Sequence, residues 1–252
     1  MTLEGKITLI TGASVGIGKA IAQLFARKGA QIALNYRSDR SVAERTLNSL
    51  EGKSHILAHG DISNPASAQN LVETVVNGFG RLDVLVNNAG IFINHPIKNV
   101  AYEQWLSAWN LTLGTNLLGA ANVSYWAVQA MLKNNGGRIV NISSRGAFRG
   151  EPDSPAYGAS KAGMNAMSQS LAKALAPLNI LVFAVAPGFV STERILSKHT
   201  PEQVKELSSQ SPLGRMTSPD EVAEAVLFLA TAAPPAMTGS ITDVNGASYL
   251  RT

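Results

Sequence analysis

The sequence contains no cysteine, and this absence excludes several kinds of chemistry. Without cysteine the chain cannot form disulfides, a thiolate nucleophile or a cysteine-bound zinc site, and we expect no metal. Charged residues make up only 15% of the 252 residues, and lysine and arginine nowhere form a run. The net charge of +4 is therefore a mild excess. We expect no nucleic-acid partner, because such binding needs clustered basic residues with aromatic residues among them.

Long apolar stretches are missing as well. No stretch approaches the roughly 18 apolar residues of a membrane-spanning helix. The first ten residues, MTLEGKITLI, lack the basic and then apolar pattern of a secretory signal. The sequence therefore predicts a cytoplasmic protein without membrane contact.

Short apolar runs alternate with longer helical patterns from one end of the chain to the other. Such alternation predicts right-handed crossovers and a parallel sheet with helices on both faces. No linker or repeat interrupts it, so we expect residues 1–252 to form one doubly wound, seven-stranded α/β domain of Rossmann type. The predicted strands are Ile7–Ile10, Gln31–Tyr36, Ser54–Ala58, Leu82–Asn87, Gly137–Ile142, Ile180–Ala186 and Ser240–Asn245. The predicted helices are Gly16–Lys28, Arg40–Leu50, Pro65–Phe79, Tyr102–Lys133, Ala156–Ala176 and Pro219–Ala230.

The predicted helix Ala156–Ala176 carries small or apolar residues on nearly every side. A helix that is apolar all round is buried all round. One face can cover the sheet, and we expect the other face to pack on a second subunit. The sequence thus predicts a homo-oligomer, either a dimer or a tetramer.

A glycine-rich turn, TGASVGIG, spans Thr11–Gly18 between the first predicted strand and the first predicted helix. Glycines let the backbone approach a pyrophosphate, and the helix N-terminus presents free N–H groups to it. The spacing is G-x-x-x-G-x-G, and a glycine-rich segment alone is often only a turn. Its place between a strand and a helix favours a dinucleotide site.

The end of the second predicted strand indicates which dinucleotide is bound. This end meets the adenosine ribose in Rossmann-type folds, and an acidic residue there favours NAD. The chain has Arg37 at this place, and a guanidinium suits the 2′-phosphate of NADP. We therefore favour NADP. Two alternatives stay open: Arg37 is an exposed loop arginine, or Asp39 turns back to the ribose and restores a preference for NAD.

Tyr157 and Lys161 are four residues apart, and Ser144 lies thirteen residues upstream of the tyrosine. The four-residue spacing places both side chains on one face of a helix. A phenol beside an ammonium loses its proton more easily, so we expect a lowered pKa for Tyr157. With a serine hydroxyl to hold a carbonyl oxygen, the three side chains suit proton transfer near neutral pH. Such a pair also occurs by chance on helix surfaces, so the catalytic interpretation depends on the motifs that accompany it.

Together these residues resemble the short-chain dehydrogenase/reductase family from about Leu3 to Tyr249. The motifs are specific in combination, and the nearest look-alikes are 3-oxoacyl-carrier-protein reductases and other NADP-linked carbonyl reductases. Two departures are Val15, where many NADP-linked members carry arginine or lysine, and Phe183, which replaces a common asparagine. The matching segments are Thr11–Gly18, Asp61-Ile62, Asn87–Gly90, Thr115–Gly119, Asn141–Ser144, Tyr157-x-x-x-Lys161, Pro187-Gly188, Thr192 and Pro212–Arg215.

The resemblance implies roles for individual residues. Ser144 and Tyr157 act on the substrate oxygen, Lys161 also holds the nicotinamide ribose, and Asn116 links Lys161 to a water chain. Ser144 and Asn116 have a structural alternative, because serine and asparagine often form local or buried hydrogen bonds. The cofactor-binding residues that the resemblance implies are Gly12, Ser14, Gly16, Ile17, Gly18, Arg37, Ser38, Asp61, Ile62, Asn88, Ala89, Gly90, Tyr157, Lys161, Pro187, Gly188, Val190 and Thr192.

The expected function is hydride transfer between NADP(H) and a carbonyl or secondary alcohol, with Tyr157 as general acid and base. One alternative is an NAD-dependent alcohol or sugar dehydrogenase of the same fold, and another is a nucleotide-sensing binding protein without chemistry. The substrate surface is expected in the irregular segments Phe92–Asn99, Arg145–Pro155 and Ser191–Met216. Their apolar residues and few charges are compatible with acyl, ring or aryl ketones.

Overall fold

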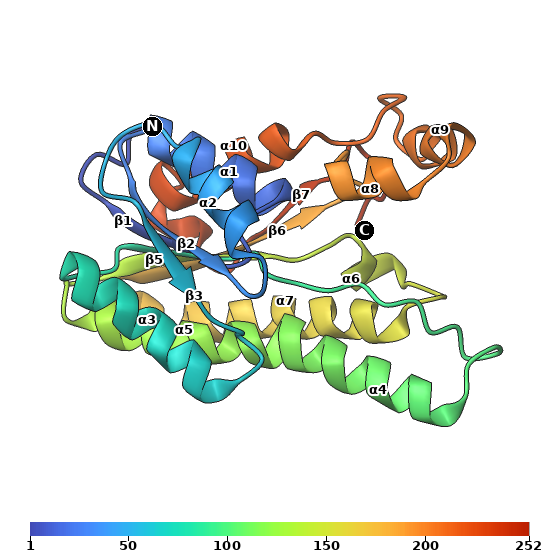
Figure 1. The fold of residues 1–252 in the computed structure, drawn as a ribbon, viewed down its shortest axis with the longest axis horizontal. Helices are drawn as coiled ribbons and strands as arrows, with labels where there is room; N and C mark the ends of the chain where they lie inside the picture. Colours follow the sequence, from blue (N-terminus) through green and yellow to red (C-terminus); the bar gives the residue numbers. More distant parts are fainter. Residues whose placement is uncertain (252) are drawn as a thin grey trace.

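The computed structural model describes residues 1–251 and shows a seven-stranded sheet between two layers of helices (Figure 1). All strand pairs are parallel, and the strand order is β3-β2-β1-β4-β5-β6-β7. The predicted fold class is therefore confirmed. The strands are β1 Ile7–Ile10, β2 Gln31–Tyr36, β3 Ile56–His59, β4 Val84–Asn87, β5 Gly137–Ile142, β6 Ile180–Pro187 and β7 Ile241–Val244.

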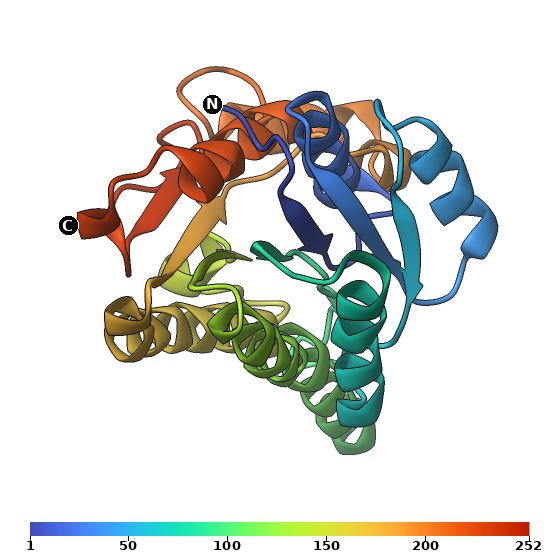
Figure 2. The same ribbon diagram turned by 90° about the vertical axis from the view of Figure 1, so that its left-hand side faces the viewer.

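Helices cover both faces of the sheet, as the end-on view shows (Figure 2). Short helices also form in the segments expected to be irregular, where Thr192 and Thr200 cap α8 and α9. The longer helices are α1 Gly16–Arg27, α2 Arg40–Asn48, α3 Pro65–Phe79, α4 Tyr102–Leu113, α5 Ala120–Leu132, α7 Pro155–Leu175 and α10 Pro219–Thr231. The shorter ones are α6 Gly146–Arg149, α8 Glu193–Lys198 and α9 Pro201–Ser209.

The sheet is buried on both faces, which is why its central strands are continuous apolar runs. Every residue of β1, β4 and β6 is buried. One core packs α1 and α10 against the sheet around Phe25 and Phe183. The other packs α3, α5 and α7 against the opposite face around Leu71 and Met131. Phe183 is thus a core residue, and this explains an apolar side chain at that position.

The predicted continuous helix Tyr102–Lys133 is wrong in one respect. A π-helical segment, η1 (Gly114–Gly119), separates α4 from α5. No proline marks the change in the sequence, although the segment reads Gly-Thr-Asn-Leu-Leu-Gly. Such π segments occur frequently at functional sites, and this one contains Asn116.

The outer face of the predicted helix Ala156–Ala176 is open in a single copy of the chain, and its burial by a second subunit stays a prediction. Its inner side is buried, whereas Ala159, Ala162 and Ala166 of α7 are exposed. These small side chains form a bare outer strip because no other part of the described chain covers them. Within residues 1–251, no helix has both the length and the apolar character that crossing a bilayer requires.

Candidate active site

The strand order of the sheet reverses between β1 and β4. From β1 the chain proceeds to β2 and β3 on one side, and from β4 it proceeds to β7 on the other. In such sheets, ligands bind where the order reverses, outside the carboxyl ends of the strands. The predicted site residues follow these ends from β1 to β6, and their geometry is therefore the test of the sequence analysis.

The glycine turn after β1 leaves no room for larger side chains. Gly12 has φ of +61°, and a Cβ on it would lie 2.9 Å from the Cα of Ala89. A Cβ on Gly18 would lie 2.5 Å from the carbonyl oxygen of Gly12. Helix α1 starts at Gly16, and Val15 at its N-cap offers no side-chain acceptor. The first amides of α1 therefore suit an anionic ligand such as a pyrophosphate.

Residues that follow β4 and β6 lie against this turn. The Asn88 side-chain amide donates to the carbonyl oxygens of Thr11 and Gly12, at 2.9 and 3.0 Å. A Cβ on Gly16 would lie 3.3 Å from the Cγ2 atom of Thr192. Three segments that are distant in the sequence therefore meet at one place, as the predicted cofactor site requires.

The adenosine end of the predicted site contains Arg37, after β2, and Asp61, after β3. One guanidinium nitrogen of Arg37 lies 4.0 Å from the Asp61 carboxylate, and both side chains are well exposed. Burial raises the pKa of Asp61, but hydrogen bonds from Ser63 and the charge of Arg37 outweigh it and lower the pKa overall. Ile62 is buried against Gly119 of η1, which leaves Asp61 as the exposed member of that pair.

Asp39 caps helix α2. Its carboxylate accepts a 3.0 Å hydrogen bond from the Val42 backbone N–H and a 2.9 Å bond from the Ser41 hydroxyl. The Val42 and Ser41 hydrogen bonds hold the pKa of Asp39 below its ordinary value. The carboxylate is therefore engaged by its own helix.

Lys161 is the most deeply placed charge of the site. Only 3% of it is exposed, and its ammonium donates a 2.7 Å hydrogen bond to the carbonyl oxygen of Ile142 at the end of β5. Burial lowers the pKa of Lys161 to about 8. The Nζ atom lies 5.8 Å from the centre of the Tyr157 ring. A Cβ on Gly90 would lie 3.6 Å from the same Nζ atom. The Tyr–Lys pair therefore lies beside the segment that follows β4.

The pKa of Tyr157 shifts in the direction opposite to the expected one. Burial raises the pKa of Tyr157, a hydrogen bond with the Ser144 side chain opposes this shift, and the charge of Glu151 adds to it. The charge of Lys161 is not among the causes of this shift, so desolvation of the phenol decides its direction. The contact with Ser144 nonetheless brings the two predicted catalytic hydroxyls together, and the Ser144 Oγ also accepts a 3.0 Å hydrogen bond from the Gly146 N–H.

Asn116 forms a bridge from η1 to two other segments. Its side chain accepts from the Ile91 N–H at 2.8 Å and donates to the Ile91 carbonyl oxygen at 2.9 Å. The same amide nitrogen donates to the Ser160 hydroxyl at 3.1 Å. The structure thus shows the structural role of Asn116, while its link to a water chain stays a prediction.

A buried polar network behind the site was not recognised in the sequence. The Asn87 amide of β4 donates to Asn141 Oδ1 of β5 at 2.8 Å and to the Ser124 hydroxyl at 2.9 Å. Asn141 in turn donates to the Ser168 hydroxyl of α7 at 2.8 Å. Both asparagines belong to the matched motifs, but only the fold reveals that they join two strands to the helix that carries Tyr157 and Lys161.

The segments expected to form the substrate surface differ in their exposure. Phe92 is 46% exposed, and its ring meets the Tyr157 ring edge-on at 4.8 Å between centres. Arg145, in contrast, is only 3% exposed, donates to the Gln210 side chain and stacks on the Phe189 ring. Phe92 therefore lies beside the predicted catalytic Tyr157, whereas Arg145 is buried and packs against Gln210 and Phe189.

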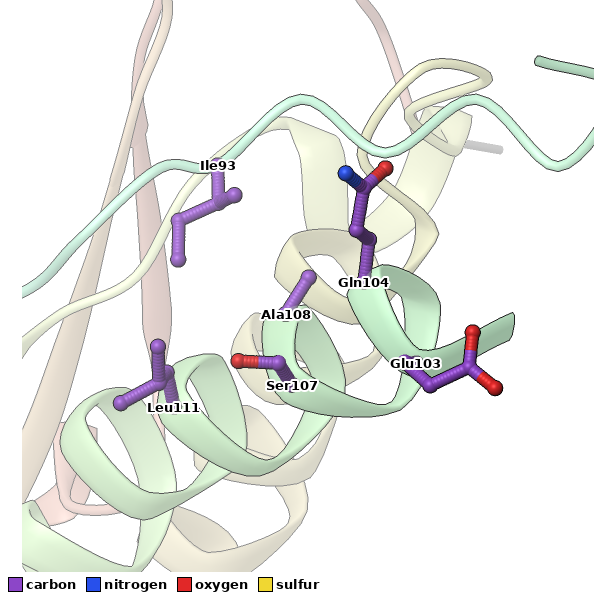
Figure 3. Close-up of a pocket in the computed structure, with 6 residues that line it drawn as sticks. All are labelled: Ile93, Glu103, Gln104, Ser107, Ala108 and Leu111. Carbon is purple, nitrogen blue, oxygen red and sulfur yellow. The ribbon is translucent and has the colours of Figure 1, made fainter. Parts of the chain in front are cut away.

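A hollow of about 330 Å³ lies between the segment before α4 and α4 itself. Ile93 faces Ala108 and Leu111 across it (Figure 3). None of the predicted catalytic or cofactor-binding residues is among the residues that line it. The hollow therefore lies apart from the catalytic and cofactor-binding residues, although Ile93 belongs to the predicted substrate segment Phe92–Asn99.

Comparison with known proteins agrees with this geometry. A family model described as Enoyl-(Acyl carrier protein) reductase matches residues 12–247. A protein named 3-oxoacyl-[acyl-carrier-protein] reductase FabG from Thermotoga maritima is 39% identical over 251 residues, which cover 98% of each chain. The chain belongs to the short-chain dehydrogenase/reductase family. This short-chain dehydrogenase/reductase is thus an oxidoreductase.

Two further relatives of similar sequence identity carry different names. A protein with the same FabG name from Escherichia coli is 37% identical to this oxidoreductase, over 99% of this chain and 100% of its own. A protein named an uncharacterized oxidoreductase from Methylorubrum extorquens is 38% identical, over 97% and 98%. Similarity of this degree supports the reaction class and leaves the substrate to be argued from the site.

Proposed function

We propose that the protein is an NADP(H)-dependent reductase of carbonyl compounds, which also acts on secondary alcohols in reverse. The observation that carries the proposal is the convergence of Ser144, Tyr157 and Lys161 beside Gly90 and the glycine turn. A glycine turn for a dinucleotide next to hydroxyl donors and a buried ammonium is the arrangement that carbonyl reduction needs.

Each of the three side chains has a role that follows from its chemistry. When bound, the nicotinamide supplies the hydride. Tyr157 donates its proton to the carbonyl oxygen and becomes the phenolate, and Ser144 donates a hydrogen bond to the same oxygen as its charge grows. Lys161, with a pKa of about 8, stabilises the phenolate and is itself able to exchange a proton near neutral pH.

The test of this mechanism is Tyr157→Phe. The substitution keeps the ring that packs on Phe92 and removes only the proton donor. We expect at least a thousandfold loss of kcat in the initial-rate assay, since proton transfer and the lost hydrogen bond both contribute, each worth roughly 10²-fold or more. Binding of the reduced cofactor, followed by its fluorescence, serves as the control and is expected to stay near the unaltered value. Turnover close to that of the unaltered enzyme contradicts the proposed role.

The preference for NADP rests on the residues at the end of β2. Arg37 extends its exposed guanidinium beside Asp61, and Asp39 is engaged as the cap of α2. A guanidinium in this position suits a 2′-phosphate. We expect Arg37→Asp to reverse the ratio of kcat/KM for NADPH to that for NADH. An unchanged ratio favours the alternative, an NAD-dependent alcohol or sugar dehydrogenase of the same fold.

The substrate class is expected to be an apolar ketone or aldehyde, because Phe92 adjoins Tyr157 and the exposed Leu196 lies in the predicted substrate segment Ser191–Met216. The FabG relatives are named for reduction of 3-oxoacyl groups on a carrier protein. A panel of acyl, ring and aryl ketones with both reduced cofactors, followed by nicotinamide absorbance, ranks these classes. Absence of turnover across the panel, with cofactor binding intact, favours a nucleotide-sensing protein without chemistry.

We also propose that the chain assembles with copies of itself, as a dimer or tetramer. The strip of Ala159, Ala162 and Ala166 on α7 is uncovered, and the exposed Leu118 and Tyr125 lie in η1 and α5. Segment η1 packs against both α5 and α7, and exposed apolar side chains on adjoining elements are typical of interfaces between subunits. Light scattering after size-exclusion chromatography measures the mass, and a mass near 26.5 kDa contradicts the proposal.

A further inference from the structure

Ala156, the residue before Tyr157, lies in the first turn of α7. The backbone N–H groups of a first helical turn have no partners within the helix and need them from elsewhere. Pro155 begins the helix and has no N–H, and the Tyr157 N–H donates to the Ser154 carbonyl oxygen at 2.9 Å. Ser154 occupies the N-cap, where a serine side chain usually accepts from the first turn. Here its hydroxyl instead donates to Asn94 Oδ1 at 3.0 Å, and it makes no cap hydrogen bond.

The missing cap is supplied by a histidine from another part of the chain. The Ala156 N–H donates to Nε2 of His95 at 3.3 Å, across 61 residues of sequence. The segment that contains His95 joins β4 to α4, and the His95 N–H donates to the Asp153 carbonyl oxygen at 2.7 Å. The side chain of His95 therefore completes the N-terminus of the helix that carries Tyr157 and Lys161.

The hydrogen bonds of His95 define its tautomer. Its Nδ1 lies 2.7 Å from the carbonyl oxygen of Ile93, which only accepts, so Nδ1 carries the proton. Nε2 then has a free lone pair and accepts from Ala156. The neutral Nδ1–H imidazole satisfies both contacts at once, whereas the Nε2–H tautomer satisfies neither.

Packing holds this ring in place. His95 is 1% exposed, and it meets the Trp105 and Trp109 rings of α4 edge-on at 5.2 and 6.5 Å between centres. Phe92, three residues earlier, packs on the Tyr157 ring. The same short segment thus contacts the helix start through His95 and the reacting phenol through Phe92.

We propose that His95 is a positioning residue of this enzyme: as a neutral Nδ1–H imidazole it caps helix α7 and sets the orientation of Tyr157. The proposal deepens the proposed reductase function and rests on it for its effect on turnover. Loss of the acceptor frays the first turn of α7, so Tyr157 samples orientations that do not reach the substrate oxygen. We expect cofactor binding to stay unchanged, because the hydrogen bonds of His95 go to Ile93, Ala156 and Asp153 and not to the glycine turn.

Two variants separate the acceptor from the packing. His95→Phe keeps an aromatic ring against the two tryptophans and removes the acceptor. His95→Gln places an amide oxygen near the Nε2 position and restores it. We expect His95→Phe to lower kcat by about tenfold or more, because small displacements of reacting groups are costly, with the KM for the cofactor unchanged. We expect His95→Gln to retain kcat within about threefold, as one similar hydrogen bond replaces another.

Two measurements do not depend on turnover. Long-range nitrogen–proton correlation in the unaltered protein is expected to show the proton of His95 on Nδ1. Amide hydrogen exchange at Ala156 and Tyr157 is expected to rise in His95→Phe and to stay near the unaltered rate in His95→Gln. Circular dichroism first establishes that both variants are folded.

The outcomes distinguish the two proposals. A proton on Nε2, equal kcat in His95→Phe and the unaltered enzyme, or equal losses in both folded variants overturns the positioning role. If the unaltered protein reduces no carbonyl compound, the proposed function fails, and the tautomer and exchange measurements still decide whether His95 caps α7.

Discussion

Burial of the Lys161 ammonium is expected to make the protein less stable than it would be without this charge. The pKa of Lys161 falls from 10.5 in an unfolded chain to about 8 in the structure. At 1.36 kcal/mol for each pH unit, this difference corresponds to about 3 kcal/mol of lost stability at pH 7. Replacement by Met keeps the side-chain volume and removes the charge, but it also removes the hydrogen bond to Ile142, worth about 1 kcal/mol. Lys161→Met is therefore expected to gain about 2 kcal/mol at pH 7 and to lose activity.

The sign of the pH dependence follows from the two proton affinities. The unfolded chain binds this proton more tightly than the folded chain, so the contribution of Lys161 to stability rises with pH between about 8 and 10.5. Below pH 8 the cost is fully present, and at pH 10 only about 1 kcal/mol of it remains. The advantage of Lys161→Met should therefore fall to near zero at pH 10.

Urea unfolding of both proteins at pH 7 and pH 10 measures this difference. Lys173→Met provides the matched control, because Lys173 is exposed on the same helix. It is expected to change stability equally at both pH values. A Lys161→Met protein that is less stable than the unaltered one at pH 7, or a difference that does not depend on pH, refutes the reasoning.

Two further predictions concern the cofactor site. Gly18→Ala places a Cβ 2.5 Å from the Gly12 carbonyl oxygen and the Asn88 amide nitrogen, so the turn must shift. We expect urea unfolding to show a loss of about 1–3 kcal/mol in stability, and a fluorescence titration to show weaker NADPH binding. An unchanged affinity for NADPH contradicts this prediction. Asp39→Ala removes the cap of α2 and nothing at the proposed ribose contact. The ratio of kcat/KM for NADPH to that for NADH should therefore stay the same, and a clear rise in this ratio would show that Asp39 reaches the ribose.

The fold was largely predictable because the central strands are buried on both faces. Apolar runs such as Ile7–Ile10 and Gly137–Ile142 end at turn residues, and their predicted bounds match the structure. The π segment at Gly114–Gly119 was not predictable, because it contains no proline and its apolar residues resume at Leu117. It depends on bonds between Asn116 and Ile91, which are adjacent only after folding.

The candidate site was predictable in its residue types but not in its electrostatics. Spacing places Tyr157 and Lys161 on one side of a helix, and the structure brings them beside Ser144. The sequence does not show how much water folding removes from each group. Desolvation lowers the pKa of Lys161 and raises that of Tyr157, the latter against expectation. His95 gave no signal because its role depends on a contact across 61 residues.

Helix α7 has two unlike sides. Tyr157 and Lys161 lie on the side that meets Ser144 and Gly90, while Ala159, Ala162 and Ala166 are exposed on the opposite side within the described chain. Any neighbour that docks there rests directly on the reverse of the catalytic element. If the proposed assembly forms through this face, it contacts the helix that contains Tyr157 and Lys161. The specific activity is then expected to decline on dilution, in parallel with the molecular mass of the assembly.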